Sequence, residues 1–272
     1  MQTSNNISEK IENIKSAIAE KGSILIAFSG GVDSSVLSAL SFQALGDNAI
    51  AVTADSETLG IGELDEAKKV AKEIGIKHII IKFNELDDPE FAKNPPERCY
   101  YCKKGLILQL KKVAKQYNIK TIADGTNISE LSGHRPGYKA IEEFGVYTPY
   151  VDFKVTKEEI REIAKFLNLS VANKPSMACV SSRFPYGHPI TLQKLNRVKQ
   201  AEYFLKGFGF SQLRVRDHDG LARIEVPIDE LKILIYNNKN IAKHLKDLGF
   251  NYVTLDLEGF RSGSMDEVFF KV

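Results

Sequence analysis

The sequence lacks several features that would assign it to a specialised class. None of its apolar runs is long enough to span a bilayer, so no membrane anchor is expected. The N-terminal segment alternates charged residues with isoleucines, which does not match the apolar core of a secretion signal. We therefore expect a cytoplasmic protein without a membrane partner. The sequence also contains no internal repeat and no low-complexity tract.

The net charge and the number of cysteines do not assign the chain to a specialised class either. The 37 basic residues nearly balance the 35 acidic residues, which argues neither for nor against nucleic acid as a partner. Three cysteines cannot all pair with one another, and a cytoplasmic location disfavours a disulfide framework. The 272 residues are long for one compact domain and favour one large and one small domain.

The hydrophobic pattern predicts an α/β fold. Apolar runs at 23–28, 49–55, 78–83 and 120–125 alternate with helical patterns at 34–45, 63–75 and 104–118. Strands that alternate with helices form a doubly wound parallel sheet, covered on both faces. A further helix is expected to start at Thr156, with Glu159 completing a capping box.

The pattern changes after about residue 185. A helix at 191–209 is followed by two alternating segments around a "DG" turn, which predicts a β-hairpin. Helices over roughly 228–247 and a strand near 251–257 complete a smaller α+β domain. We therefore expect domains at 1–185 and 186–272.

The stretch "SGGVDSS" follows the first predicted strand and opens a helix. Backbone N–H groups of such a turn, together with the helix N-terminus, form a phosphate site. The predicted nucleotide ligands in it are Ser29, Gly30, Gly31, Asp33, Ser34 and Ser35. Asp33 either holds Mg²⁺ or caps the helix, and a plain glycine turn remains the alternative. The Walker lysine pattern and GxGxxG are both absent.

Two further strands end in polar residues. Asp55 ends the second strand, and "DGTN", with Gly125 and Thr126, ends the fourth. The carboxyl ends of parallel strands line the ligand crevice, so Asp55 is a candidate for the nucleotide pocket. For Gly125 and Thr126, a place at this pocket is what the family resemblance described below implies. For Asp55, a strand-end turn is an equal alternative.

The cysteines occur as "RCYYC" and "MACVSSR". The pair Cys99 and Cys102, in a polar segment that we expect to be a loop, suits a redox, zinc or iron–sulfur site, or none. With Cys179, three thiolates could hold three irons of a cubane cluster and leave one open; three buried, inert thiols are the alternative. Lys174 and Arg183 flank Cys179 and would lower its thiol pKa if they lay close.

The order strand, SGGxDS, helix resembles the PP-loop ATP pyrophosphatases, which release pyrophosphate and attach AMP to the substrate. The set SGGVDSS, RCYYC, DGTN, HRPG, KPSMACVSSRFPYG, RVR, ARIEV and GFRSGS spans nearly the full chain. Together these motifs resemble the LarE family, ATP-dependent sulfur transferases of nickel-pincer-nucleotide cofactor synthesis.

The resemblance implies an enzyme with ATP, Mg²⁺ and a [4Fe-4S] cluster as cofactors. ATP would adenylate a carboxylate of pyridinium-3,5-biscarboxylate mononucleotide, and sulfur would then give a thiocarboxylate. In one kind of member the cysteine matching Cys179 is consumed as the sulfur donor. In the other, three cysteines hold the cluster; the presence of Cys99 and Cys102 favours this kind. The resemblance also suggests a homo-oligomer.

Arginines of the second domain, together with Arg183 at the end of the first, are candidates for binding the phosphate of a mononucleotide substrate. Arg214 and Arg216 share one face of a strand, whereas Arg183 and Arg261 lie in loops and Glu202 on a helix. A charged solvent face with cross-strand ion pairs is the alternative for Arg214, Arg216 and Arg261, and a solvated helix residue is the alternative for Glu202.

Two other functions stay open. Related PP-loop enzymes thiolate tRNA, and lysines at 103, 104, 111, 112 and 115 could form a basic helix, although a solvated face explains them equally well. The second alternative is a nucleotide sensor without chemistry, which would have little use for the three cysteines.

Overall fold

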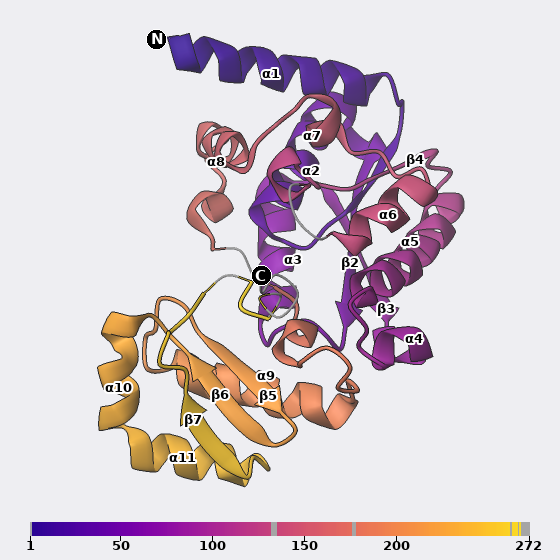
Figure 1. Ribbon diagram of the computed structural model, residues 1–272. Coiled ribbons are helices and arrows are strands. Elements are labelled where there is room, and N and C mark those ends of the chain that lie inside the picture. The colour runs from indigo at the N-terminus through magenta and orange to yellow at the C-terminus, as the bar shows by residue number, and fades with distance from the viewer. Residues whose placement is uncertain (1, 132–134, 176–177, 262, 266, 268–272) are drawn as a thin grey trace. The chain divides into compact units, whose positions relative to one another are not determined.

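The structure is a computed structural model that describes residues 2–131, 135–175, 178–261, 263–265 and 267 (Figure 1). Three motifs therefore lie partly outside the described residues, at His134, at Ser176 and Met177, and at Ser262. The chain divides into two compact units, which are described separately. The first comprises residues 1–56, 62–88 and 97–177, and the second residues 57–61, 89–96 and 178–272.

The first unit contains a four-stranded sheet in the order β3-β2-β1-β4, in which every pairing is parallel. Its elements are α1 (Gln2–Ala19), β1 (Ile24–Ala27), α2 (Val32–Leu45), η1 (Gly46–Asn48), β2 (Ala49–Ser56), α3 (Glu63–Ile74), β3 (Lys77–Phe83), η2 (Glu85–Asp87), α5 (Arg98–Gln116), β4 (Thr121–Ala123), η3 (Ile128–Glu130), α6 (Pro136–Glu143), α7 (Pro149–Asp152), α8 (Lys157–Phe166) and η4 (Ser170–Asn173). The predicted α/β fold with a parallel sheet is confirmed.

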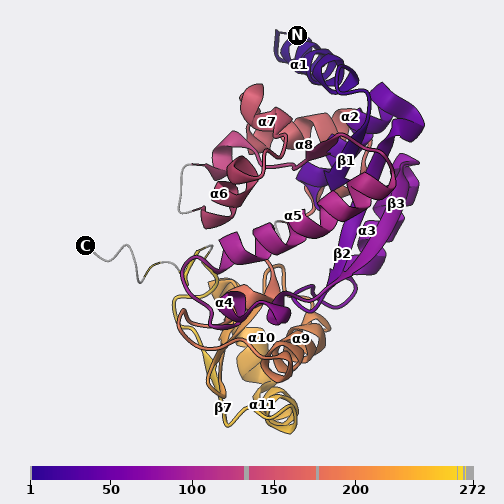
Figure 2. The same cartoon turned by 90° about the vertical axis from the view of Figure 1, so that its right-hand side faces the viewer.

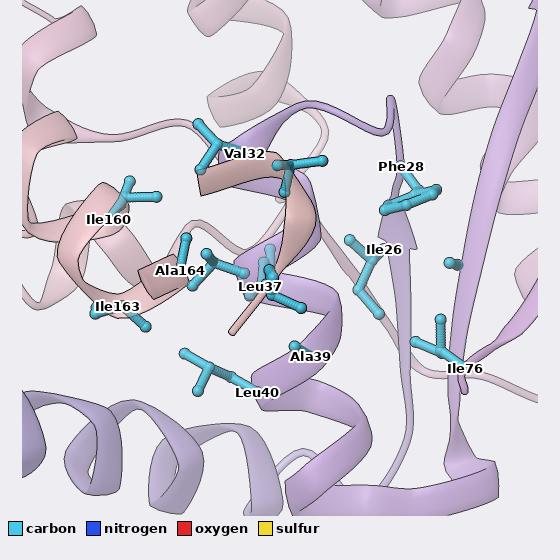
Figure 3. Close-up of a cluster of buried hydrophobic side chains, with 14 of the residues drawn as sticks. Ile26, Phe28, Val32, Leu37, Ala39, Leu40, Ile76, Ile160, Ile163 and Ala164 are labelled. Atoms are coloured by element: carbon cyan, nitrogen blue, oxygen red, sulfur yellow. The ribbon is translucent and has the colours of Figure 1, made fainter. Parts of the chain in front are cut away.

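Alternation along β1 explains the two layers of helices. Ile24 and Ile26 point into a core with α1, α2, α3 and α8, part of which Figure 3 shows. Leu25 points the other way, into a core with α5, which lies along the sheet in Figure 2. Because side chains of a strand alternate between faces, a strand that is apolar throughout requires helices on both sides.

Helix α8 begins as the sequence predicts. The Thr156 hydroxyl accepts from Glu159 N, and the Glu159 carboxylate accepts from Thr156 N, which completes the capping box. Each bond satisfies a backbone N–H group that the helix start would otherwise leave unpaired.

The second unit has a three-stranded sheet in the order β5-β6-β7. Its elements are α4 (Pro89–Ala92), η5 (Val180–Arg183), α9 (Leu192–Lys206), β5 (Arg214–His218), β6 (Leu221–Glu225), η6 (Ile228–Glu230), α10 (Leu231–Tyr236), α11 (Asn238–Asp247) and β7 (Tyr252–Leu255). The predicted hairpin forms with Asp219 and Gly220 at its turn, both with positive φ, as a tight hairpin turn requires. β7 pairs in parallel with β6.

Candidate functional site

The phosphate loop of the first unit is organised by its own hydroxyls. Ser29 Oγ accepts from Gly31 N at 3.2 Å and lies 3.1 Å from Ser34 Oγ, which donates to Gly31 O at 3.3 Å. Gly31 is the N-cap of α2, and no side chain caps it. Asp33 is the second residue of the helix, so the alternative that it is a simple N-cap is wrong. The first N–H groups of α2 have no intrahelical acceptor, which suits an anion.

Gly30 lets the loop pack closely against α3, and Ser35 adds a buried hydroxyl. Gly30 has φ +70°, and a Cβ there would lie 2.7 Å from Ala67 Cα of α3, so only glycine fits this approach. Ser35 is fully buried, and its hydroxyl has no hydrogen-bond partner within the described residues. An orphaned buried hydroxyl one turn into the helix suits a ligand oxygen.

Asp33 is held by residues from distant parts of the chain. Its carboxylate pairs with Lys157 of α8 and accepts from Asn127 Nδ2 at 3.1 Å. Its carbonyl accepts from Tyr150 Oη at 3.1 Å. Burial, and secondarily the Asp33 charge, raises the pKa of Tyr150 well above its ordinary value, so this hydroxyl keeps its proton. No sequence pattern indicates that Lys157 and Tyr150 take part.

The "DGTN" loop packs directly against the phosphate loop. A Cβ on Gly125 would lie 3.1 Å from both Asp33 C and Ser34 N. The neighbouring Asp124 is buried and pairs with Lys103 Nζ at 2.9 Å, while Thr126 donates to it from both N and Oγ1. The structure thus brings the predicted residues Gly125 and Thr126 beside the phosphate loop.

Two carboxyls near these loops have pKa values shifted in opposite directions. Burial raises the pKa of the Asp124 carboxyl, but the Lys103 charge and the bonds from Thr126 outweigh it and leave that pKa below its usual value. Burial also raises the pKa of Glu130, and the charges of Asp33 and Asp124 add to this rise. Burial is the main cause of the Glu130 shift, and the charges of Arg135 and Lys157 oppose it.

Asp55 lies at the end of β2, as predicted, but its carboxylate is already matched. It pairs with Lys82, its register partner on β3. The Asp55 side chain is 29% exposed, so the pair is partly accessible to solvent. A nucleotide contact by Asp55 stays a prediction.

The cysteine pair lies on a helix, and the expected loop is wrong. α5 begins at Arg98, so Cys99 and Cys102 occupy its first turns three residues apart and on one face. Cys99 is exposed and Cys102 half-buried, and neither forms a disulfide. Polar residues occur in the first turn of a helix as well as in loops, so the polar composition of this segment did not reveal that the helix begins at Arg98. The alternative of buried, inert thiols is wrong for Cys99.

Cys179 belongs to the second unit and is also exposed. It is the N-cap of η5, the short helix that carries Arg183. The Arg183 guanidinium donates to Cys179 O at 3.2 Å and to Ala178 O at 3.0 Å. This arginine therefore fixes the backbone around the cysteine. The other flanking cation, Lys174, lies in the first unit and pairs with Glu66.

Buried ion pairs order the arginines of the second unit. Arg183 makes two bonds to Glu202, at 2.7 and 3.1 Å, and Glu202 also accepts from Val215 N. Glu202 is only 9% exposed, so the alternative of a solvated helix residue is wrong. Arg216 binds Glu225 through two bonds, at 3.0 and 2.9 Å. Bidentate pairs of this kind fix the orientation of both partners.

Arg214 differs from these arginines because no carboxylate pairs with it within the described residues. Its guanidinium donates to Leu213 O at 2.7 Å and lies 5.2 Å from the Phe260 ring centroid. Burial, followed by the charges of Arg183 and Arg216, lowers the pKa of Arg214 to about 10. A half-buried cation crowded by other cations favours an anionic ligand.

Arg261 has the opposite surroundings. It pairs with Glu267 and with Glu258, both at 2.9 Å, and approaches Asp256 at 3.7 Å. The Glu267 bond is the main cause that raises the pKa of Arg261. Among the described residues, Arg261 is therefore surrounded by acids, whereas Arg214 has no acid partner.

Neither a metal centre nor a membrane span is found in the described part of the chain. It contains no group of three or more His, Cys, Asp or Glu side chains placed to hold a metal ion. No helix among the described residues has the length and apolar character needed to cross a bilayer.

Known proteins are similar to the chain, some over the phosphate loop and some over nearly its whole length. The asparagine synthase family profile matches residues 13–99, which include the phosphate loop. A pyridinium-3,5-bisthiocarboxylic acid mononucleotide synthase of Lactiplantibacillus plantarum is 35% identical over 97% of this chain and 96% of its own length. The chain belongs to the LarE family.

Two other relatives are similar to the chain over different shares of its length. An uncharacterised protein of Synechocystis is 39% identical over 97% of this chain and all of its own length. A glutamine-hydrolysing GMP synthase component of Methanococcoides burtonii is 28% identical, over 66% of this chain and 63% of its own length. The LarE resemblance and the use of ATP by a PP-loop domain are thereby confirmed.

Proposed function

We propose that the protein is an ATP-dependent sulfur transferase acting on pyridinium-3,5-biscarboxylate mononucleotide. The observation that carries this proposal is the similarity to the L. plantarum synthase over nearly the whole of both chains. It adenylates one carboxylate of the mononucleotide and converts it to a thiocarboxylate. AMP and pyrophosphate are the other products.

The first step takes place in the first unit. A carboxylate oxygen of the substrate attacks the α-phosphorus of ATP, an O–P bond forms, and pyrophosphate leaves with the electron pair of the broken bond. The β- and γ-phosphates fit the N-terminus of α2, supported by Ser29, Ser34 and the orphaned Ser35 hydroxyl. The loop has no Walker lysine, and Lys157 supplies a positive charge beside Asp33 instead.

Mg²⁺ suits this region because of its carboxylates. We assign Asp33 as the principal ligand, since magnesium prefers carboxylate oxygens and phosphates. The raised pKa of Glu130 beside Asp33 and Asp124 is relieved by a bound cation. Mg²⁺ would neutralise charge on the polyphosphate as it leaves.

The second step replaces the adenylated oxygen by sulfur. A sulfur nucleophile attacks the carboxyl carbon, the C–O bond to AMP breaks, and AMP carries away the former carboxylate oxygen. We propose Arg214 as the binding residue for the substrate phosphate, because it is the candidate arginine whose charge is not matched by an acid within the described residues. Arg183, Glu202 and Arg216 would keep the surrounding backbone in place.

We propose that Cys99, Cys102 and Cys179 hold a [4Fe-4S] cluster. Two observations support the fit: Cys99 and Cys102 share one face at the start of α5, and Cys99 and Cys179 are exposed. With three cysteine ligands, one iron of the cluster would stay without a protein ligand and would be open to an added sulfide. The alternative is that Cys179 gives up its own sulfur, in which case only that cysteine is needed.

Homo-oligomerisation and a cytoplasmic location stay predictions. So does the absence of a nucleic-acid partner. No described contact favours tRNA over the mononucleotide.

The function is tested by incubating the protein with ATP and the biscarboxylate mononucleotide under anaerobic conditions. Chromatography and mass spectrometry should find AMP, pyrophosphate and a thiocarboxylate product. ADP with orthophosphate would contradict the assignment, and absence of any nucleotide product would favour a sensor.

The source of sulfur needs a second experiment. Protein purified anaerobically should contain iron and sulfide, and C99A, C102A and C179A should each lose both brown colour and activity. The polypeptide mass should be unchanged after turnover. A colourless, active protein that loses the mass of hydrogen sulfide from Cys179 would establish the sacrificial route.

A further inference from the structure

Lys174 reaches the backbone of the phosphate loop from 144 positions away in the sequence. Its Nζ donates to Gly30 O at 3.2 Å and pairs with Glu66 of α3 at 2.7 Å. The Lys174 side chain is 18% exposed, whereas that of Glu66 is 53% exposed. The three residues belong to the first unit, so this contact is internal to it.

The contact fixes one particular peptide group. In a trans peptide the C=O and the following N–H point in opposite directions. When Lys174 holds Gly30 O, the Gly31 N–H is therefore directed to the other side, where it donates to Ser29 Oγ at 3.2 Å. Ser29 Oγ is in turn part of the hydroxyl cluster at the start of α2.

This peptide joins two glycines, which makes its orientation easy to lose. Glycine reaches φ values of either sign at little cost, so a Gly-Gly peptide can rotate with little steric resistance. The observed φ values are +70° at Gly30 and −82° at Gly31. After rotation, the Gly31 N–H would no longer donate to Ser29 Oγ, and the hydroxyl cluster at the start of α2 would lose this bond.

The backbone of Lys174 is itself anchored. Arg161 of α8 donates to Ala172 O at 2.8 Å and to Lys174 O at 2.9 Å. Arg161 lies one helical turn after Lys157, which pairs with Asp33. Helix α8 therefore supports the phosphate loop at two points, through the Asp33 side chain and, by way of Lys174, through the Gly30 carbonyl.

We propose that Lys174 is a positioning residue for ATP, which holds the Gly30–Gly31 peptide in the orientation that keeps the Gly31 N–H on Ser29 Oγ and so maintains the hydroxyl cluster of the phosphate loop. The inference deepens the proposed function, because it rests on the phosphate loop being the ATP site. No part of it requires Lys174 to touch the nucleotide. The loss of its ammonium group disturbs the loop before any ligand arrives.

The test compares K174M, K174R and E66Q with a matched control, K68M. Lys68 follows Ala67 on α3 and forms an exposed pair with Asp65, so its loss removes the same charge. Hydrogen exchange of residues 28–36 is measured without nucleotide, and the Kd of Mg²⁺ with α,β-methylene-ATP is measured by calorimetry. K174M should exchange faster in the loop and bind about tenfold more weakly.

The other variants separate peptide orientation from charge. K174R retains a donor and E66Q retains the Lys174–Gly30 bond, so both should bind within about threefold of the wild type, as K68M should. Wild-type exchange and affinity in K174M would overturn the inference, and so would E66Q binding as weakly as K174M. If K174M does not fold, E66Q and K174R still decide it, because a tenfold loss in either contradicts the proposed bond.

This result is independent of the chemical assay. A wild-type protein that forms AMP and pyrophosphate while K174M binds like the wild type retains the proposed function and loses the inference. If the wild-type protein forms neither product but K174M binds the nucleotide weakly, the inference about Lys174 is retained and the proposed function is lost.

Discussion

The carboxylate of Asp33 pairs with the ammonium group of Lys157, 124 residues further along the chain. Both side chains are about one-fifth exposed, at 22% and 23% respectively, so the pair is neither sealed from solvent nor fully screened. The pair joins the phosphate loop to helix α8. It also places a positive charge beside Asp33, in a loop that has no Walker lysine.

Asp33 and Lys157 should both be required for the adenylation step. D33A removes the proposed magnesium ligand, and K157M removes the charge that orients it. We expect each change to lower the rate of pyrophosphate release at least about tenfold, which corresponds to roughly 1.4 kcal/mol in the barrier. A coupled pyrophosphate assay under saturating substrates measures this rate.

Lys165 provides the control for this prediction. It is exposed on the same helix, so K165M removes an equal charge away from the site. Full activity in D33A and K157M would remove both from the mechanism. A loss in K165M as large as that in K157M would indicate a general effect on α8.

Arg214 and Arg261 should contribute unequally to substrate binding. Arg214 has no acid partner in the described part of the chain, whereas Arg261 is already paired with Glu258 and Glu267. We expect R214A to weaken mononucleotide binding by about tenfold or more, as the loss of a charged hydrogen bond does. R261A should weaken it by less.

Calorimetry with the mononucleotide and, separately, with ATP measures both effects. ATP affinity should remain unchanged in R214A, because we assign the ATP phosphates to the phosphate loop and Arg214 to the phosphate of the mononucleotide. Weakened ATP binding with unchanged mononucleotide binding would show that the two ligands have been assigned to the wrong residues.

Folding stability should fall as the solution becomes acidic, and His78 should account for part of this. Burial, and secondarily the charge of Lys68, lowers the pKa of His78 below its ordinary 6.5. Just below that pH the unfolded chain binds a proton that the folded chain does not, so acidification favours unfolding. Burial lowers the pKa of His218 in the same direction.

Urea unfolding between about pH 7.5 and 5.5 tests this. The free energy of unfolding should decrease toward the acid end, and H78Q should show a smaller decrease than the wild type. His218 is unchanged in H78Q, so part of the pH dependence should remain. An identical pH dependence in H78Q and wild type would contradict the assignment.

Local patterns predicted the fold better than they predicted the site. Apolar strands, the capping box at Thr156 and the turn at Asp219 and Gly220 depend on neighbouring residues, and the structure contains all of them. The start of α5 at Arg98 was missed because polar residues occur equally in loops and in first helical turns.

The partners of the site residues could not be found in the same way. Lys157, Asn127 and Tyr150 converge on Asp33 only after the strands and helices have packed. The same holds in the second unit, where Arg214 and Arg216 share a strand pattern but, among the described residues, only Arg216 finds an acid. Sequence spacing indicates which face a side chain occupies, but the pairing of its charge is set by tertiary contacts.

The central claim is that a carboxylate oxygen of the substrate is adenylated and then replaced by sulfur. It is tested most directly with mononucleotide labelled with ¹⁸O in its carboxylates. The AMP released during turnover is analysed by mass spectrometry. One ¹⁸O atom per AMP is predicted, since the oxygen attached to the α-phosphorus leaves with AMP. AMP without the label, formed while the product retains all of its ¹⁸O, would contradict the account.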